Sequence, residues 1–157
     1  MTNRAKDNEW IEWTRRIKQW GVELGFDAVG IADCDLSLAE QRLASWLAEG
    51  KHGDMDYMAR HGRKRTRPEL LKPGTLRVIS ARLDYLPEPA ERSLALLQDP
   101  ETAFISRYSL GRDYHKVLRK KLQRLSERID TAIGGGDYRV FVDSAPVMEK
   151  PLSLIHI

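Results

Sequence analysis

The sequence predicts a single α/β domain in which a mixed or mostly parallel sheet is flanked by helices. Three observations support this prediction: helix-like and strand-like segments alternate, no segment repeats, and 157 residues is about the size of one domain. The composition, 41% hydrophobic and 31% charged, is ordinary for a globular protein. No stretch is apolar for long enough to cross a bilayer, and the start lacks a secretory signal. We therefore expect a cytoplasmic protein with no membrane partner.

The first part of the chain predicts a helix, a strand and a second helix. Apolar residues recur at spacings of three and four over residues 10–24, which is typical of a helix packed on one face. The apolar run 26–32 predicts a buried strand. Ser37 and Glu40 have the spacing of a capping box, and Gly50 ends the helix that they begin.

The second part of the chain predicts three strands and two helices. Residues 77–85 alternate well enough to form a central strand, and residues 104–108 and 138–142 predict shorter ones. Residues 91–98 predict a short helix. A strongly amphipathic helix is predicted to begin at Asp113, whose side chain is placed to cap it.

Several types of site are excluded because the sequence lacks the residues that they require. The single cysteine, Cys34, excludes an internal disulfide and any zinc or iron–sulfur site built from several cysteines of this chain. We expect Cys34 to be a small buried side chain. The sequence has no GxxxxGKS/T phosphate loop and no GxSxG nucleophile elbow. None of the four histidines has a partner at a spacing typical of a metal site or belongs to an HExxH pair, so we assign no metal to protein ligands.

Basic residues gather in two clusters, although the formal net charge is only +3. The first lies within residues 60–67 and the second within residues 116–128. Either could contact phosphates, and the alternative is a solvated basic face. That alternative is favoured for the second cluster because it lies on a predicted helix. The two interpretations have equal weight for the first.

Two further segments hold polar residues where α/β proteins place ligands. Residues 106–115 gather polar, aromatic and glycine residues before a helix N-terminus, which is suited to an anionic group, although a capped helix start also explains them. Asp143 follows the predicted strand 138–142, and ligands commonly bind beyond the carboxyl ends of strands. An acid at that place is more often a turn or cap residue than a catalyst.

Five strings occur in a fixed order along the chain. They are GFDAVGIAD (25–33), HGDMDYMARHG (52–62), LKPGTLRVIS (71–80), SRYSLGRDYHKVLRKKL (106–122) and FVDSAPVMEK (141–150). Together they resemble the epoxyqueuosine reductase family, and the resemblance runs from about Ile17 to Leu152.

The resemblance implies an oxidoreductase of queuosine biosynthesis. Members of this family reduce epoxyqueuosine, at the wobble position of certain tRNAs, to queuosine, using cobalamin and electrons relayed by two 4Fe–4S clusters. The implied partners are tRNA carrying epoxyqueuosine and an external electron donor. We expect the protein to be a monomer.

The resemblance also implies roles for individual residues. Asp143 matches the family's proton donor, which protonates the departing epoxide oxygen, and it also lies at the cobalamin site. Burial beside the apolar face of the corrin would favour the protonated acid. Arg65, Ser106 and Met148 match cobalamin contacts. Arg63, Lys64 and Arg67, the neighbours of Arg65, could contact tRNA phosphates.

The resemblance ends before the chain does. Residues 1–152 are expected to form the cobalamin-binding N-terminal domain, whereas residues 153–157 do not resemble the family's continuation. The ferredoxin-like domain whose cysteines bind the clusters is absent from this sequence, so we expect the fragment to be inactive alone. Two alternatives are a basic α/β module that binds RNA and a flavin-binding module, both without this chemistry.

Overall fold

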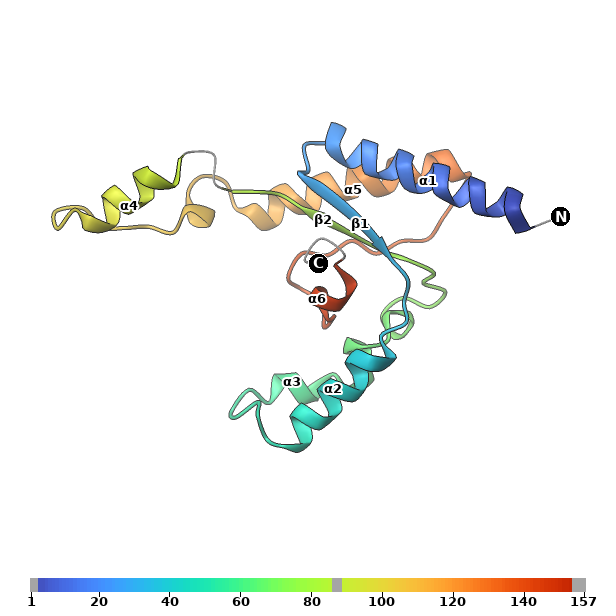
Figure 1. Ribbon diagram of the computed structural model, residues 1–157, viewed down its shortest axis with the longest axis horizontal. Helices are drawn as coiled ribbons and strands as arrows, with labels where there is room; N and C mark the ends of the chain where they lie inside the picture. The colour runs from blue at the N-terminus through green and yellow to red at the C-terminus, as the bar shows by residue number, and fades with distance from the viewer. Residues whose placement is uncertain (1–2, 86–88, 154–157) are drawn as a thin grey trace.

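A computed structural model of the protein describes residues 3–85 and 89–153 (Figure 1). The helices are α1 (Asn3–Glu23), α2 (Ser37–Ala48), α3 (Tyr57–Arg60), α4 (Ala90–Gln98), α5 (Tyr114–Ile133) and α6 (Glu149–Leu152). The strands are β1 (Ala28–Ala32) and β2 (Val78–Arg82), and short 3₁₀ turns are η1 (Gly62–Arg65), η2 (Pro68–Leu70) and η3 (Arg107–Ser109). Of the expected tail 153–157, all but Ser153 lies outside the described residues.

The sheet consists of β1 and β2, paired antiparallel with Gly30 opposite Ser80 and Ile31 opposite Ile79. Helices and strands in a single domain confirm the predicted α/β class. The mixed or mostly parallel sheet is not confirmed, because the described residues form only this antiparallel pair. Within them, no helix is long and apolar enough to span a membrane.

The strands predicted at 104–108 and 138–142 are wrong. Residues 104–106 are irregular and run into η3, while residues 137–141 are without regular structure. Side chains, rather than a backbone ladder, attach the second segment: Arg139 donates to the carbonyl of Leu71 (3.2 Å), and Asp137 forms an ion pair with Lys72. Apolar alternation alone does not make a strand, because a strand needs a neighbouring backbone to bond to.

The core lies where α1 and α5 cover one face of the sheet (Figure 1). Its buried residues are Ile17, Trp20, Phe26, Val29 and Leu125. Side chains alternate between the faces of a strand, so Ile79 and Ala81 of β2 pack against this core. Ser80 instead donates its hydroxyl to the carbonyl of Leu152 in α6 (3.4 Å), which attaches α6 to β2.

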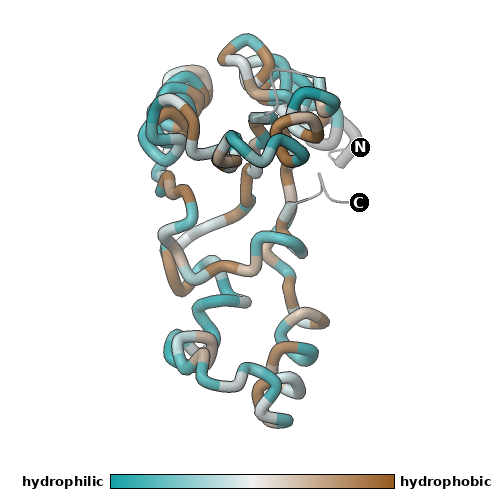
Figure 2. The backbone as a smooth tube through the Cα atoms, turned by 90° about the vertical axis from the view of Figure 1, so that its left-hand side faces the viewer, coloured by the Kyte–Doolittle hydropathy of each residue, from teal (hydrophilic) through white to brown (hydrophobic). Residues whose placement is uncertain are grey.

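Two parts of the chain extend away from this core (Figure 1). One contains α2, α3 and η1, and the other is an arm formed by α4 and the segment that returns to η3. Hydrophobic segments, brown in Figure 2, occur both in the upper part of the molecule and in the lower part. Apolar residues are therefore not confined to the core layer.

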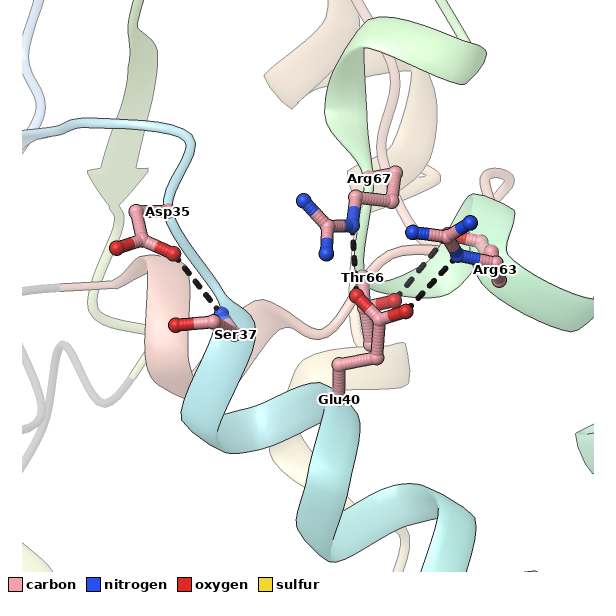
Figure 3. Close-up of polar contacts among 6 residues, drawn as sticks. All are labelled: Asp35, Ser37, Glu40, Arg63, Thr66 and Arg67. Carbon is pink, nitrogen blue, oxygen red and sulfur yellow. Dashed lines mark hydrogen bonds and ion pairs between the residues drawn. The ribbon is translucent and has the colours of Figure 1, made fainter.

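The predicted capping box of α2 is wrong. The residue before the helix is Leu36, and the backbone N–H of Ser37 donates to Oδ1 of Asp35 (3.0 Å). Glu40 points instead to the basic loop, where it accepts from Arg63 (2.9 Å) and Arg67 (2.6 Å) (Figure 3). Glu40 thus joins α2 to the loop around η1.

Candidate functional site

Asp143 has an unusual backbone and two close partners. Its φ is 51°, and among the described residues every other residue with a positive φ is a glycine. This left-handed conformation is costly for L-residues, although aspartate tolerates it better than most. Oδ2 of Asp143 accepts a hydrogen bond from the Tyr114 hydroxyl (2.8 Å) and lies 3.6 Å from Nε2 of His115. A strained turn therefore holds the carboxylate at the start of α5.

Asp113 holds the other side of the His115 ring. It caps α5, as predicted, by accepting from the backbone N–H of His115 (3.0 Å), and its Oδ1 lies 3.1 Å from Nδ1 of the same residue. The hydrogen bond with the His115 side chain lowers the pKa of Asp113 below its usual value despite some desolvation. His115 therefore lies between two carboxylates, those of Asp113 and Asp143.

Tyr114 is held as a hydrogen-bond donor to Asp143. The hydrogen bond to Asp143 raises the pKa of the Tyr114 phenol, and desolvation adds to the effect, so the phenol keeps its proton. The Asp143 side chain is 50% exposed. Half of the side chain therefore remains accessible to solvent or to a ligand.

Aromatic rings connect Ser106 to this carboxylate. Ser106 precedes η3, and its carbonyl accepts from the N–H (3.0 Å) and the hydroxyl (2.6 Å) of Ser109. Within η3, the Tyr108 ring lies edge to face with Tyr114, at 5.9 Å between centroids. The segment that contains Ser106 therefore contacts Asp143 indirectly, through Tyr108 and Tyr114.

Arg65 and Met148 form a second pair. The backbone N–H of Met148 donates to the carbonyl of Arg65 (3.1 Å). The Arg65 guanidinium donates to the carbonyls of Met58 (3.1 Å) and Tyr57 (2.9 Å), so part of its hydrogen-bonding capacity stabilises its own loop. Of the four predicted site residues, the structure brings Arg65 into contact with Met148.

Cys34 is partly buried rather than fully buried as predicted. Its thiol donates to the carbonyl of Thr75 (3.7 Å), and desolvation raises the pKa of the thiol. Among residues 3–85 and 89–153, no group of three or more His, Cys, Asp or Glu side chains is arranged to hold a metal ion.

Sequence reasoning missed Tyr114 and His115 as partners of Asp143. Both lie inside the quoted string SRYSLGRDYHKVLRKKL, but neither was assigned a role. The signal was their place just after the helix cap Asp113, where side chains at the first turn are directed toward neighbouring loops. Their contact with Asp143 could not be predicted because it joins segments distant in sequence.

Comparisons with known proteins agree on one family. Residues 65–144, more than half of the chain, match the family model described as "Epoxyqueuosine reductase QueG, DUF1730". An epoxyqueuosine reductase of Vibrio cholerae is 54% identical over 145 residues, covering 92% of this chain and 39% of that protein. One of Pseudomonas aeruginosa is 58% identical over 137 residues, covering 87% and 38%.

A solved structure has the same fold. The epoxyqueuosine reductase of Streptococcus thermophilus superposes with a TM-score of 0.63 at 23% identity, covering 87% of this chain and 36% of that one. The present chain therefore spans roughly two fifths of the length of the curated relatives that it matches. On the family match and these identities, the chain belongs to the epoxyqueuosine reductase QueG family.

Proposed function

We propose that the chain is the cobalamin-binding N-terminal portion, residues 1–152, of an enzyme that reduces epoxyqueuosine to queuosine in tRNA. The single observation that carries the proposal is the strained Asp143 held by Tyr114 and His115, in a chain of this family. The proposed partners of the complete enzyme are tRNA and an external electron donor. We propose that the enzyme also uses two 4Fe–4S clusters and works as a monomer in the cytoplasm.

The reaction needs both electrons and protons. Converting an epoxide to an alkene breaks two C–O bonds, consumes two electrons and two protons, and releases water. Bound cobalamin would supply the electrons at the reacting carbon. A positioned acid must protonate the oxygen as it leaves, which contributes typically 10²- to 10⁴-fold to such reactions.

Asp143 is placed to supply one of those protons. Its strained backbone fixes the direction of the carboxyl, and Tyr114 occupies Oδ2, which leaves Oδ1 for the substrate. Half of the side chain is exposed, so water can return the proton after each turnover. In this proposal, Tyr114 and His115 position the acid rather than contact the substrate.

The residues near Ser106 fit a corrin. A corrin presents a broad apolar face and a polar amide rim, so its site needs exposed apolar side chains beside hydrogen-bonding groups. Phe104 (41% exposed), Tyr108 (53%) and Leu110 (55%) lie within four positions of the exposed Ser106 in the sequence. We propose that Ser106, Asp143, Arg65 and Met148 would hold the polar rim of the corrin.

A visible-absorbance titration of the 157-residue chain with cob(II)alamin tests the cofactor assignment. We expect a saturable spectral change in wild type and in the Asp143→Asn variant, and none with a flavin. A flavin response, or no cobalamin response from a sample whose far-ultraviolet circular dichroism shows it to be folded, contradicts the assignment. In the full-length enzyme, Asp143→Asn should retain cobalamin and lose about 10²-fold or more in turnover.

A further inference from the structure

Four basic side chains lie on the N-terminal part of α5 and a fifth lies two residues before it, and we call the five the α5 stripe. They are Arg112, Lys116, Arg119, Lys120 and Arg124. All five are exposed. Within the part of the chain that the structure describes, none of these side chains makes a hydrogen bond, an ion pair or a ring contact.

Other cations are already bound within the protein. Arg63 and Arg67 of the first basic cluster bind Glu40 (2.9 and 2.6 Å; Figure 3). On α5 itself, Lys121 donates to a backbone carbonyl (2.9 Å), and Arg128 forms an ion pair with a carboxylate of α1 (2.6 Å). Pairing of this kind reduces the positive charge and the hydrogen-bond donors that a cation can present to a ligand. The structure therefore favours the α5 stripe over the first cluster as a phosphate-binding surface, against the weighting that the sequence suggested.

The stripe is fixed on the outer face of a rigid helix. The opposite face of α5 packs its leucines into the core, including the fully buried Leu125. At about 100° per residue, the four stripe residues within α5 occupy an arc of roughly 140° centred opposite Leu125, and Lys116 to Arg124 covers about 12 Å along the axis. A shallow depression of about 310 Å³ adjoins it, lined by Arg112, Asp113, Lys116, Val117 and Lys120. A row of charges of this length matches successive phosphates of one strand better than a single small anion.

The helical part of the stripe begins one residue after the two partners of the candidate acid. Lys116 directly follows Tyr114 and His115, which contact Asp143. We infer that the α5 stripe binds the sugar–phosphate backbone of an RNA strand whose reacting nucleotide lies at Asp143. The inference rests on the proposed function for the identity of that nucleotide, but the charge geometry alone predicts the RNA contact.

The test compares two double variants of the 157-residue chain with equal charge. Lys116→Glu/Lys120→Glu alters the stripe, and Lys18→Glu/Arg42→Glu alters exposed cations of α1 and α2 that are likewise unpaired in the described structure. Each substitution changes the net charge by −2, so both variants go from +3 to −1. Fluorescence anisotropy of a labelled anticodon stem–loop RNA, measured across a salt series, gives affinity and the number of phosphate contacts.

We expect the stripe variant to bind RNA at least about tenfold more weakly, and its salt slope to fall by about 1.4, from two lost single-strand contacts. The control variant should keep the wild-type slope. Equal losses in the two variants, or no RNA binding by folded wild type, would overturn the inference. Lys116→Gln/Lys120→Gln should show a smaller loss in the same direction, which separates lost attraction from added repulsion.

Cobalamin titration of the same samples separates this inference from the proposed function. If the stripe variant binds cobalamin normally and RNA as tightly as wild type, the inference that the stripe binds RNA is wrong while the proposed function stands. If wild type binds RNA through the stripe but does not bind cobalamin, the inference about RNA binding is supported and the proposed function of this portion is wrong.

Discussion

The backbone of Asp143 predicts an unusual order of stability among substitutions at that position. A φ of 51° costs most L-residues about 1–2 kcal/mol, costs glycine almost nothing, and is tolerated by asparagine and aspartate. Asp143→Ala should therefore be less stable than Asp143→Gly by about 1 kcal/mol. At most other loop positions, where φ is negative, glycine is the more destabilising of the two, because it has more conformational freedom to lose.

Thermal or urea unfolding of the 157-residue variants measures this order. A difference of about 1 kcal/mol corresponds to roughly 2–4 °C in Tm for a chain of this size. Asp143→Asn should lie close to wild type, because asparagine also tolerates the left-handed conformation. If Asp143 is the proton donor that we propose, all three substitutions should impair turnover of the full-length enzyme, since none of the new side chains can donate the proton. Stability and activity would then vary independently across the series.

Two results would refute the reasoning. If Asp143→Ala is as stable as Asp143→Gly, the turn does not impose a positive φ. If Asp143→Gly, the variant without strain, retains turnover in the full-length enzyme, the carboxyl is not the proton donor. Tyr114→Phe in wild type and in the Asp143→Gly background completes the test, because the substitution should affect stability only where the acceptor carboxylate is present.

Two other perturbations test how the domain is held together. Although desolvation opposes it, hydrogen bonds from Arg67 and Arg63 hold the pKa of Glu40 below its usual value. The stability this pairing contributes is present above the unfolded-state pKa and is lost as pH falls through the folded-state value. Glu40→Gln should therefore be less stable than wild type at pH 7, and urea unfolding should show the difference shrinking as pH falls to about 3; a difference independent of pH contradicts this. A Cβ on Gly21 would overlap the stiff Val29 side chain, so Gly21→Ala should cost about 1–3 kcal/mol, more than the roughly 1 kcal/mol that alanine gains in a helix. Adding Val29→Ala should recover part of that loss in urea, and no recovery would mean that the overlap is not the cause.

Local sequence pattern was enough to predict the elements whose hydrophobic periodicity and caps lie within the element itself. The apolar periodicity of 10–24 gave α1, the polar and apolar faces of the helix after Asp113 gave α5, and β1 and β2 lie within the predicted strands. Each of these predictions depends on residues within a few positions of one another. Hydrophobic periodicity and helix caps are both determined by residues that are near one another in the sequence.

Predictions failed where the outcome depends on distant partners. The apolar segments around Phe104 and Tyr138 alternate like strands, but no described strand lies beside either of them. Glu40 looked like a capping residue and is instead bound to two arginines more than twenty positions away. Asp143 was predicted to follow a strand at 138–142, which the structure does not contain. Its left-handed backbone and its contact with Tyr114 are tertiary features.

The amount of exposed surface leads to a last prediction. The chain exposes 11637 Å², whereas a compact monomer of 18.0 kDa should expose about 8,000 Å². Part of the excess is apolar: Leu94 and Leu97 of the α4 arm are both 58% exposed. Apolar surface of this extent tends to be covered by another surface. We therefore expect the 157-residue chain by itself to self-associate with rising concentration.

Sedimentation velocity can show whether the arm drives that association. Leu94→Gln/Leu97→Gln removes apolar surface from the arm without adding charge and keeps good helix formers in α4. Leu38→Gln/Val22→Gln removes a similar amount from two exposed residues, 59% and 60% exposed, on α2 and α1. If the arm is responsible, only the first pair should shift the distribution toward monomer. Equal shifts would mean that exposed apolar area as such causes association, and a wild-type chain that stays monomeric at high concentration would show that the excess surface is stably hydrated.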